Sequence, residues 1–130
     1  MLYVMRTAAV VSSLTVNGTN VYYSQSFDIR NAIYFGCWLK ATSGTGTPKM
    51  QIQLEQSYVL PTTEQASDSN WVVPDGLSDI VSALNDQLAH IYALSPKTLP
   101  YARFKITGLA TNPTDTVLNI NVATQEPGGR

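Results

Sequence analysis

The sequence is short of charge. Only 13% of its 130 residues are Asp, Glu, Lys or Arg, about half of the roughly one quarter that is usual in soluble domains. The formal net charge of -1 gives no electrostatic reason to expect nucleic acid or an acidic membrane as a partner. So little surface charge predicts that part of the surface is covered by other protein chains. The alternative is that hydroxyl and amide side chains suffice for solubility.

Cysteine and histidine are nearly absent, with one residue of each. Cys37 therefore cannot form an internal disulfide, and its apolar neighbours predict a small core residue. His90 stands in no recognisable motif, and a zinc site needs three or four ligands of the Cys/His type. The nine carboxylates are scattered along the chain. Their positions do not indicate two that would face each other in a cleft, as a glycosidase requires. We therefore predict no catalytic residue, no metal site and no cofactor, and we expect that the protein is not an enzyme.

Long hydrophobic runs are also missing. No apolar stretch approaches the length that is needed to span a membrane, so we expect no membrane partner. Residues 1–6 lack the basic start and the continuous apolar run of a signal peptide. We therefore expect no export by the usual secretory route.

Alternation of apolar and polar residues is the clearest positive signal. It runs through residues 101–107 and 116–122, and a period of two predicts strands with one apolar face and one wet face. A segment rich in turn formers, residues 108–115, separates them. Asn17-Gly18 predicts a two-residue hairpin turn between short strands. Further strand-like segments are residues 2–11, 26–29, 32–41, 49–55, 71–73 and 88–94.

These strands define a fold class. About seven to nine short strands, with turn signals between them, predict an all-β single-domain antiparallel β-sandwich over residues 1–130. We expect it to be jelly-roll-like, with at most one short helix. The one helical candidate is Leu77–Leu84, where apolar residues fall at helical spacing. The C-terminal tail, residues 125–130, is predicted to be flexible.

Two apolar segments are candidates for contacts between chains. Residues 2–11 and 32–41 are apolar on both faces, and such a strand is either covered twice or lies at a subunit contact. The candidate oligomer or capsid contacts are Tyr3, Met5, Tyr34 and Trp38. Aromatic residues could instead form a stacking platform for sugars, although the same residue types serve cores and interfaces. Those aromatic residues are Tyr22, Tyr23, Tyr34, Trp38, Tyr58, Trp71 and Tyr101.

The segments that carry a resemblance to a known family are residues 94–108, 111–117 and 122–126, together with Trp71-Val-Val-Pro-Asp-Gly76. They resemble small virion structural proteins of tailed bacteriophages, over about the C-terminal half of the chain. The resemblance implies a capsid decoration (cement) protein, a β-sandwich that trimerises and stabilises the shell by binding the major capsid protein. It also implies synthesis in the host cytoplasm and a final location on the capsid surface. It carries no residue-level motif, so no functional residue is transferred. The alternative is a carbohydrate- or receptor-binding module of a phage tail fibre or spike.

Overall fold

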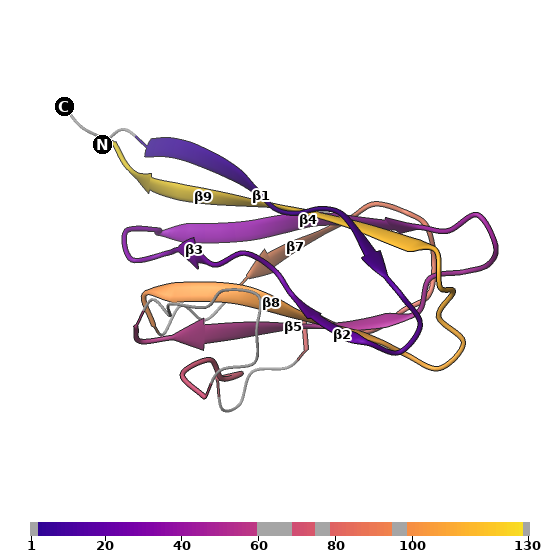
Figure 1. The fold of residues 1–130 in the computed structure, drawn as a ribbon. Coiled ribbons are helices and arrows are strands. Elements are labelled where there is room, and N and C mark those ends of the chain that lie inside the picture. Colours follow the sequence, from indigo (N-terminus) through magenta and orange to yellow (C-terminus); the bar gives the residue numbers. More distant parts are fainter. Residues whose placement is uncertain (1–2, 60–68, 75–78, 95–98, 129–130) are drawn as a thin grey trace.

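The computed structural model describes residues 3–59, 69–74, 79–94 and 99–128. Within these ranges the chain forms nine β-strands and no helix, arranged as two packed layers (Figure 1). The strands are β1 (Tyr3–Val16), β2 (Val21–Tyr23), β3 (Phe27–Asp28), β4 (Tyr34–Thr42), β5 (Met50–Ser57), β6 (Val81–Leu84), β7 (His90–Leu94), β8 (Tyr101–Gly108) and β9 (Thr116–Pro127).

The strand order identifies the sandwich as a jelly roll. One layer, sheet A, has the order β1-β9-β4-β7, and the other, sheet B, has the order β2-β8-β5-β6 with β3 beside β8. All of these pairs are antiparallel. The chain passes between the sheets repeatedly, which places strands that are distant in sequence side by side, as in a jelly roll. The predicted fold class, a single-domain antiparallel β-sandwich, is confirmed.

The inner faces of the two sheets form the hydrophobic core. The alternating residues that the sequence assigned to the apolar faces of β8 and β9 are buried there. Phe104 and Ile106 of β8 and Leu118 and Ile120 of β9 are fully buried. Cys37 of β4 lies in the same cluster, which confirms its prediction as a core residue. Side chains that alternate across each strand therefore place one complete face in the core.

The turn at Asn17-Gly18 forms, but the predicted hairpin does not. Gly18 has φ of +60°, the left-handed conformation that glycine adopts without strain, and the Asn20 N–H donates to the Asn17 carbonyl over 3.3 Å. However, β1 pairs with β9 and β2 pairs with β8, so the turn is a corner between the sheets. The local sequence specifies the turn, whereas the flanking strands take partners that bury more apolar surface.

The helix predicted for Leu77–Leu84 is wrong over the residues that the structure describes. Residues 81–84 form β6, in which Leu84 is paired with Met50 of β5, and residues 77–78 lie outside the described ranges. One or two turns of isolated helix are marginal in water. Pairing with β5, together with burial of Leu84 in the core, stabilises this segment more than one or two turns of helix would.

The end of β9 extends into the predicted flexible tail. Residues 125–127 are the last residues of β9 and pair with Met5, Val4 and Tyr3 of β1. The paired ends of β1 and β9 extend away from the rest of the sandwich (Figure 1). This extension is important for the cavity described below.

Candidate functional site

The side of sheet A that points away from sheet B is a broad surface with little charge. We call it the outer face of sheet A. Alternating burial along β4, together with the registers of β1, β7 and β9, assigns residues to it. These residues are Tyr3, Met5, Thr7, Ala9, Tyr34, Gly36, Trp38, Lys40, Thr42, Ile91, Ala93, Val117, Asn119, Asn121, Ala123 and Gln125.

The structure places all four predicted contact residues on this outer face. Tyr3, Met5 and Tyr34 are 51%, 62% and 67% exposed, and Trp38 is half-buried. Met5 and Tyr34 flank Gln125 from the two neighbouring strands, so they form one row across the sheet. The register thus brings together residues that are some thirty positions apart in the sequence.

Ile91 belongs to the same surface, and the sequence did not nominate it. It is 81% exposed and lies directly opposite Trp38 in the pairing of β4 with β7. Its segment, residues 88–94, is apolar almost throughout, so sequence alone could not tell which side chains point inward. The register of β7 against β4 provides that information.

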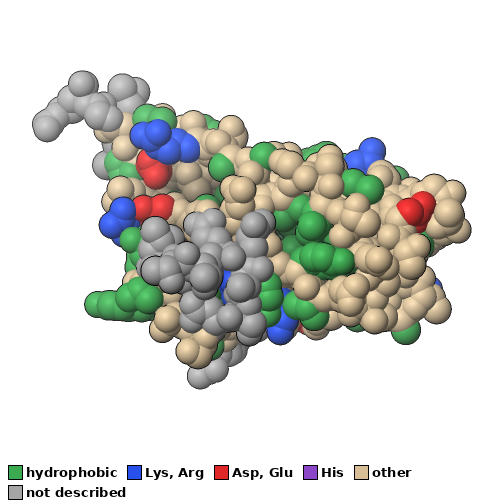
Figure 2. Space-filling model, viewed as in Figure 1, with side chains coloured by type: hydrophobic (Ala, Val, Ile, Leu, Met, Phe, Trp, Pro, Cys, Tyr) green, Lys and Arg blue, Asp and Glu red, His purple; other side chains and the backbone are tan. Residues whose placement is uncertain are grey.

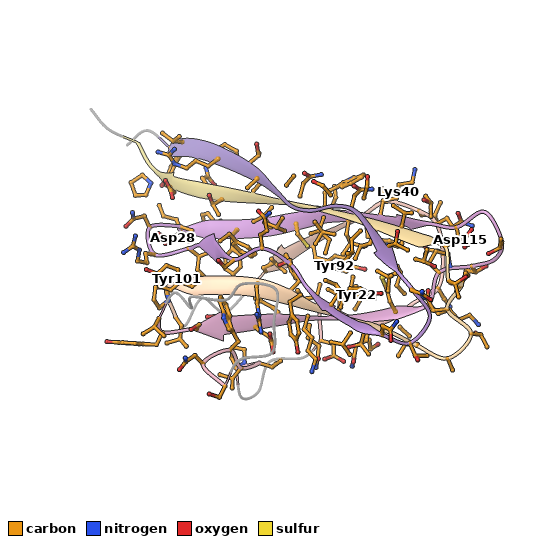
Figure 3. All side chains as sticks on the ribbon, viewed as in Figure 1. Tyr22, Asp28, Lys40, Tyr92, Tyr101 and Asp115 are labelled. Carbon is orange, nitrogen blue, oxygen red and sulfur yellow. The ribbon has the colours of Figure 1, made fainter. Side chains whose placement is uncertain are left out.

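Charge is sparse on the outer face. Among the residues assigned to it, Lys40 alone carries a formal charge, and it projects from the outer side of sheet A (Figure 3). In the view of Figure 2, charged side chains form small separate groups, and most of the visible surface is uncharged or hydrophobic. Exposed apolar side chains that cluster in this way are characteristic of interaction surfaces.

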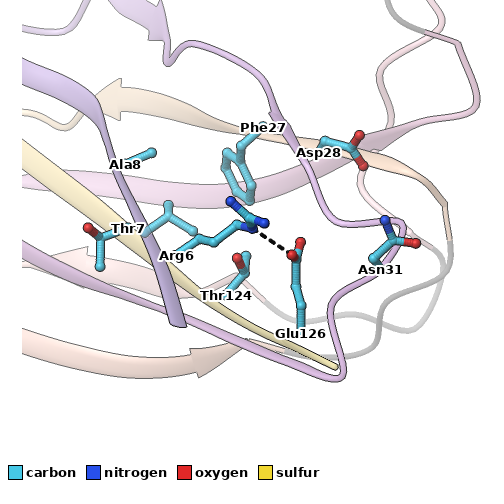
Figure 4. Close-up of a pocket in the computed structure, with 9 residues that line it drawn as sticks. Arg6, Thr7, Ala8, Phe27, Asp28, Asn31, Thr124 and Glu126 are labelled. Atoms are coloured by element: carbon cyan, nitrogen blue, oxygen red, sulfur yellow. Dashed lines mark hydrogen bonds and ion pairs between the residues drawn. The ribbon is translucent and has the colours of Figure 1, made fainter. Parts of the chain in front are cut away.

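A second feature is a cavity of about 370 Å³ at the end of the sandwich where β1 and β9 extend (Figure 4). Its residues are Arg6, Thr7, Ala8, Phe27, Asp28, Asn31, Val122, Thr124 and Glu126. Arg6 and Glu126 form an ion pair of 2.7 Å inside it. Asp28 is held by Arg30 at 2.6 Å, and hydrogen bonding to this guanidinium lowers the pKa of the Asp28 carboxyl. Polar groups from three separate parts of the chain therefore converge on one space.

The aromatic residues considered as a sugar platform lie on different surfaces. Tyr34 and Trp38 are on the outer face of sheet A, whereas Tyr23 and Trp71 stack on the Arg103 guanidinium at 4.1 Å and 4.8 Å. Arg103 itself is 1% exposed and bonds to Glu55 over 2.9 Å. The alternation in residues 101–107 predicted that Arg103 would face solvent. Trp71 covers this part of β8, so Arg103 is buried instead.

The remaining reactive groups have structural partners. His90 Nε2 lies 2.8 Å from Asp86 Oδ1, and this hydrogen bond lowers the pKa of the Asp86 carboxyl. Burial raises the pKa of the Cys37 thiol to about 12, so the thiol is not a ready nucleophile at neutral pH. Among the described residues, no group of three or more His, Cys, Asp or Glu side chains could hold a metal ion.

Neither a protein-family model nor a curated protein sequence matches this chain. Over the parts that the structure describes, no helix is long and apolar enough to cross a membrane. The fold and the two surface features define the chain as a jelly-roll β-sandwich with an apolar outer sheet face and, at one end, a cavity lined by both polar and apolar groups.

Proposed function

We propose that the protein is a bacteriophage virion structural protein, a capsid decoration (cement) protein that assembles as a trimer. In this proposal it binds the major capsid protein and stabilises the shell from its outer surface. The observation that carries the proposal is the outer face of sheet A, where exposed apolar side chains gather around a single formal charge. The phage assignment rests on the resemblance of the C-terminal half, and the jelly roll adds only an analogy with other viral coat proteins.

The composition of the outer face suits contact with another protein. Tyr, Trp and Met are enriched at protein interfaces, and charged residues are depleted at their centres. Tyr34, Met5 and Ile91 present large apolar surfaces there. Burying three such side chains would contribute about 4–8 kcal/mol, which is comparable with the lower part of the roughly 4–15 kcal/mol that association costs. These residues alone therefore support only a modest contact.

The size of the face allows a larger contact than these three side chains provide. Along the central strand β4 it spans nine residues, or about 30 Å, and four strands cover about 19 Å across. The resulting footprint of about 570 Å² underestimates the accessible surface of projecting side chains, and a standard interface buries about 800 Å² on each partner. The face is thus large enough for one specific interface.

The free edge of β1 is a second contact element. β1 is one of the two edge strands of sheet A, and its exposed residues 3–9 contain no proline and one charge, on Arg6. Unprotected edges of this kind readily accept another strand. Trimer contacts would therefore combine side chains of the outer face with main-chain hydrogen bonds along β1.

A decoration role requires no active site. Binding to the assembled lattice stabilises that lattice by mass action, because the intact shell is the state that binds. Repeated sites around a shell add avidity, so each contact can remain modest.

The oligomer is tested by solution mass, measured by size-exclusion chromatography with light scattering at about 100 μM, where contacts of micromolar affinity are populated. We expect a mass about three times the chain mass of 14.2 kDa. Tyr34→Asp should give monomers, because it places a charge in the contact. Tyr58→Asp is the matched control, since Tyr58 is 76% exposed and lies beyond the end of β5 in the other sheet. A monomeric wild type, or a trimer that survives Tyr34→Asp, would contradict assembly through this face.

The virion assignment is tested separately. Mass spectrometry of purified phage particles from cells that produce the chain should detect it at a fixed ratio to the major capsid protein. Electron microscopy with antibodies against the chain should label the heads of these particles. Particles without the chain would overturn the decoration role, and labelling confined to tails would favour the tail-fibre alternative.

A further inference from the structure

The cavity lies where sheet A extends past the core. β1 and β9 continue to Tyr3 and Pro127, whereas the strand of sheet B on this side, β3, has only two residues. The inner face of the extended ends is consequently not covered by a full strand. Phe27 and Asp28 of β3 and Asn31 of the following turn form the opposite wall (Figure 4).

The inward-facing residues change character at this point. Along β9 they run from Leu118 and Ile120, which are fully buried, through Val122 to Thr124 and Glu126. A polar series could simply meet solvent at the end of a sandwich. However, the Glu126 side chain is only 18% exposed and Thr124 is buried, so these groups lie against the wall of a partly open cavity. A charged group so well covered requires polar partners.

The charged groups around the cavity form ion pairs, so their charges cancel. Glu126 is neutralised by Arg6, and Asp28 is neutralised by Arg30. Two carboxylates therefore face the space, each already paired with a guanidinium, so the site does not favour a phosphate or another anion. The described residues also offer no cluster that could hold a metal ion. The electrostatics select an uncharged ligand.

The polar groups are suited to hydroxyl groups. The Glu126 carboxylate, bonded to Arg6 Nε, keeps lone pairs that accept hydrogen bonds, and the Asn31 amide can both donate and accept. The Arg6 guanidinium has more N–H donors than the bond from its Nε to Glu126 uses. Phe27 adds an apolar ring on the same wall, against which the C–H face of a sugar ring can pack. Hydroxyl groups and C–H faces on one neutral molecule are the chemistry of a saccharide.

We propose that this cavity binds a neutral saccharide of one or two rings, with Glu126 and Asn31 receiving its hydroxyl groups and Phe27 its apolar face. The volume of about 370 Å³ is at the small end of the range for ligand sites, roughly 300–1,000 Å³. This function goes beyond shell stabilisation and does not depend on it. Many copies on one particle would convert weak individual binding into firm attachment to a surface that carries glycans.

Saturation-transfer NMR with the wild-type protein tests the proposal. The probes are glucose, galactose, mannose, rhamnose, N-acetylglucosamine and maltose, each at about 10 mM, a concentration that detects millimolar affinity. Glucose 6-phosphate and N-acetylneuraminic acid serve as anionic probes. We expect transfer to at least one neutral sugar, and weaker transfer to its anionic counterparts.

Two variants test whether the sugar binds in the cavity. Asn31→Ala removes an exposed turn amide, and Glu126→Gln removes one charge of the cavity. Each should weaken the affinity for the bound sugar at least tenfold. Asn121→Ala is the matched control for Asn31→Ala, because Asn121 is also exposed but lies on the outer face of sheet A. Backbone amide spectra verify that each variant is folded.

The outcomes separate this proposal from the shell function. Sugar binding that is lost in both cavity variants and retained in Asn121→Ala supports the saccharide site. No transfer to any neutral probe, stronger transfer to the anionic ones, or binding that both cavity variants retain would overturn it. Loss in Asn121→Ala alone would move the site to the outer face and overturn it as well. The solution mass of each variant is measured in parallel, since the cavity variants should leave the oligomer intact.

Discussion

Replacing Asn112 with alanine should destabilise the sandwich strongly, because this side chain connects three segments that are distant in the sequence. Its amide nitrogen donates to the carbonyls of Val16 and Gly18 over 3.0 Å and 2.8 Å. Its amide oxygen accepts from the Lys49 N–H over 2.9 Å and the Thr116 hydroxyl over 3.1 Å. All four hydrogen-bonding positions of the amide are thereby used.

The expected loss in the free energy of unfolding depends on how deeply each hydrogen bond of Asn112 is buried. The bonds to Val16 and Thr116 are buried, and those to Gly18 and Lys49 are partly buried. A buried polar group that loses its partner costs about 1–3 kcal/mol, whereas groups that reach water lose less. Together these terms give about 3–5 kcal/mol, a large part of the roughly 5–15 kcal/mol by which a typical domain is stable. At about 4 °C per kcal/mol the melting temperature should fall by about 12–20 °C.

Urea denaturation followed by tryptophan fluorescence, with thermal melting as a second probe, measures this loss. Asn119→Ala is the matched control, because Asn119 makes a single exposed hydrogen bond, to the Ser13 N–H over 2.8 Å. We expect the control to lose no more than about 1 kcal/mol. A loss below about 1 kcal/mol for Asn112→Ala would refute the reasoning, since it would mean that the four partners satisfy themselves elsewhere.

A second substitution at the same position checks the mechanism. The carboxylate introduced by Asn112→Asp can accept but cannot donate to the carbonyls of Val16 and Gly18, so its protonated form is favoured in the folded state. Its folded pKa is then raised, and stability relative to wild type should increase as the pH falls and decrease as the pH rises through that pKa. A difference from wild type that is constant with pH would show that the amide protons are not the essential feature.

Two further changes test other polar contacts. Glu55→Gln removes the carboxylate that pairs with the buried Arg103 guanidinium and should lower the free energy of unfolding by about 3 kcal/mol in urea titrations; a loss below about 1 kcal/mol would mean that the other contacts of Arg103, among them the stacked rings of Tyr23 and Trp71, stabilise the charge. Hydrogen bonds from Ser43 and Thr45 lower the pKa of Asp115 below its ordinary 3.8, so its contribution to stability is present above that value and is lost as the pH falls through the folded pKa. When the pH is lowered from about 5 to about 2, the melting temperature of Asp115→Asn should therefore fall less than that of wild type. An equal fall in the two proteins would contradict this.

Local patterns predicted strands well where one face is buried and one is wet. Residues 101–107 and 116–122 fall inside β8 and β9, with the expected apolar residues in the core. The period of two is a property of the strand itself, so no partner has to be known. Residues 81–84 form a strand and not the predicted helix, because helical spacing over one or two turns is weak evidence when a neighbouring strand offers pairing.

The surface features depend on pairing between distant segments. Tyr3, Met5, Tyr34 and Trp38 were nominated because their strands have no wet side, but only the register shows that they share one face with Ile91. The cavity had no signal in the sequence. Arg6 and Glu126 are 120 positions apart, and nothing in either segment indicates that they meet.

The sequence by itself determined the all-β class, the separation into short strands and the apolar face of the clearest strands, because turn residues and alternation act over a few neighbouring positions. Tertiary structure decided which sheet each strand joins, since strand partners are chosen by the burial of whole faces. It turned the Asn17-Gly18 turn into a corner between sheets and buried Arg103 beneath Trp71. It also left the ends of β1 and β9 extending past the core, so that their inward polar residues surround a cavity.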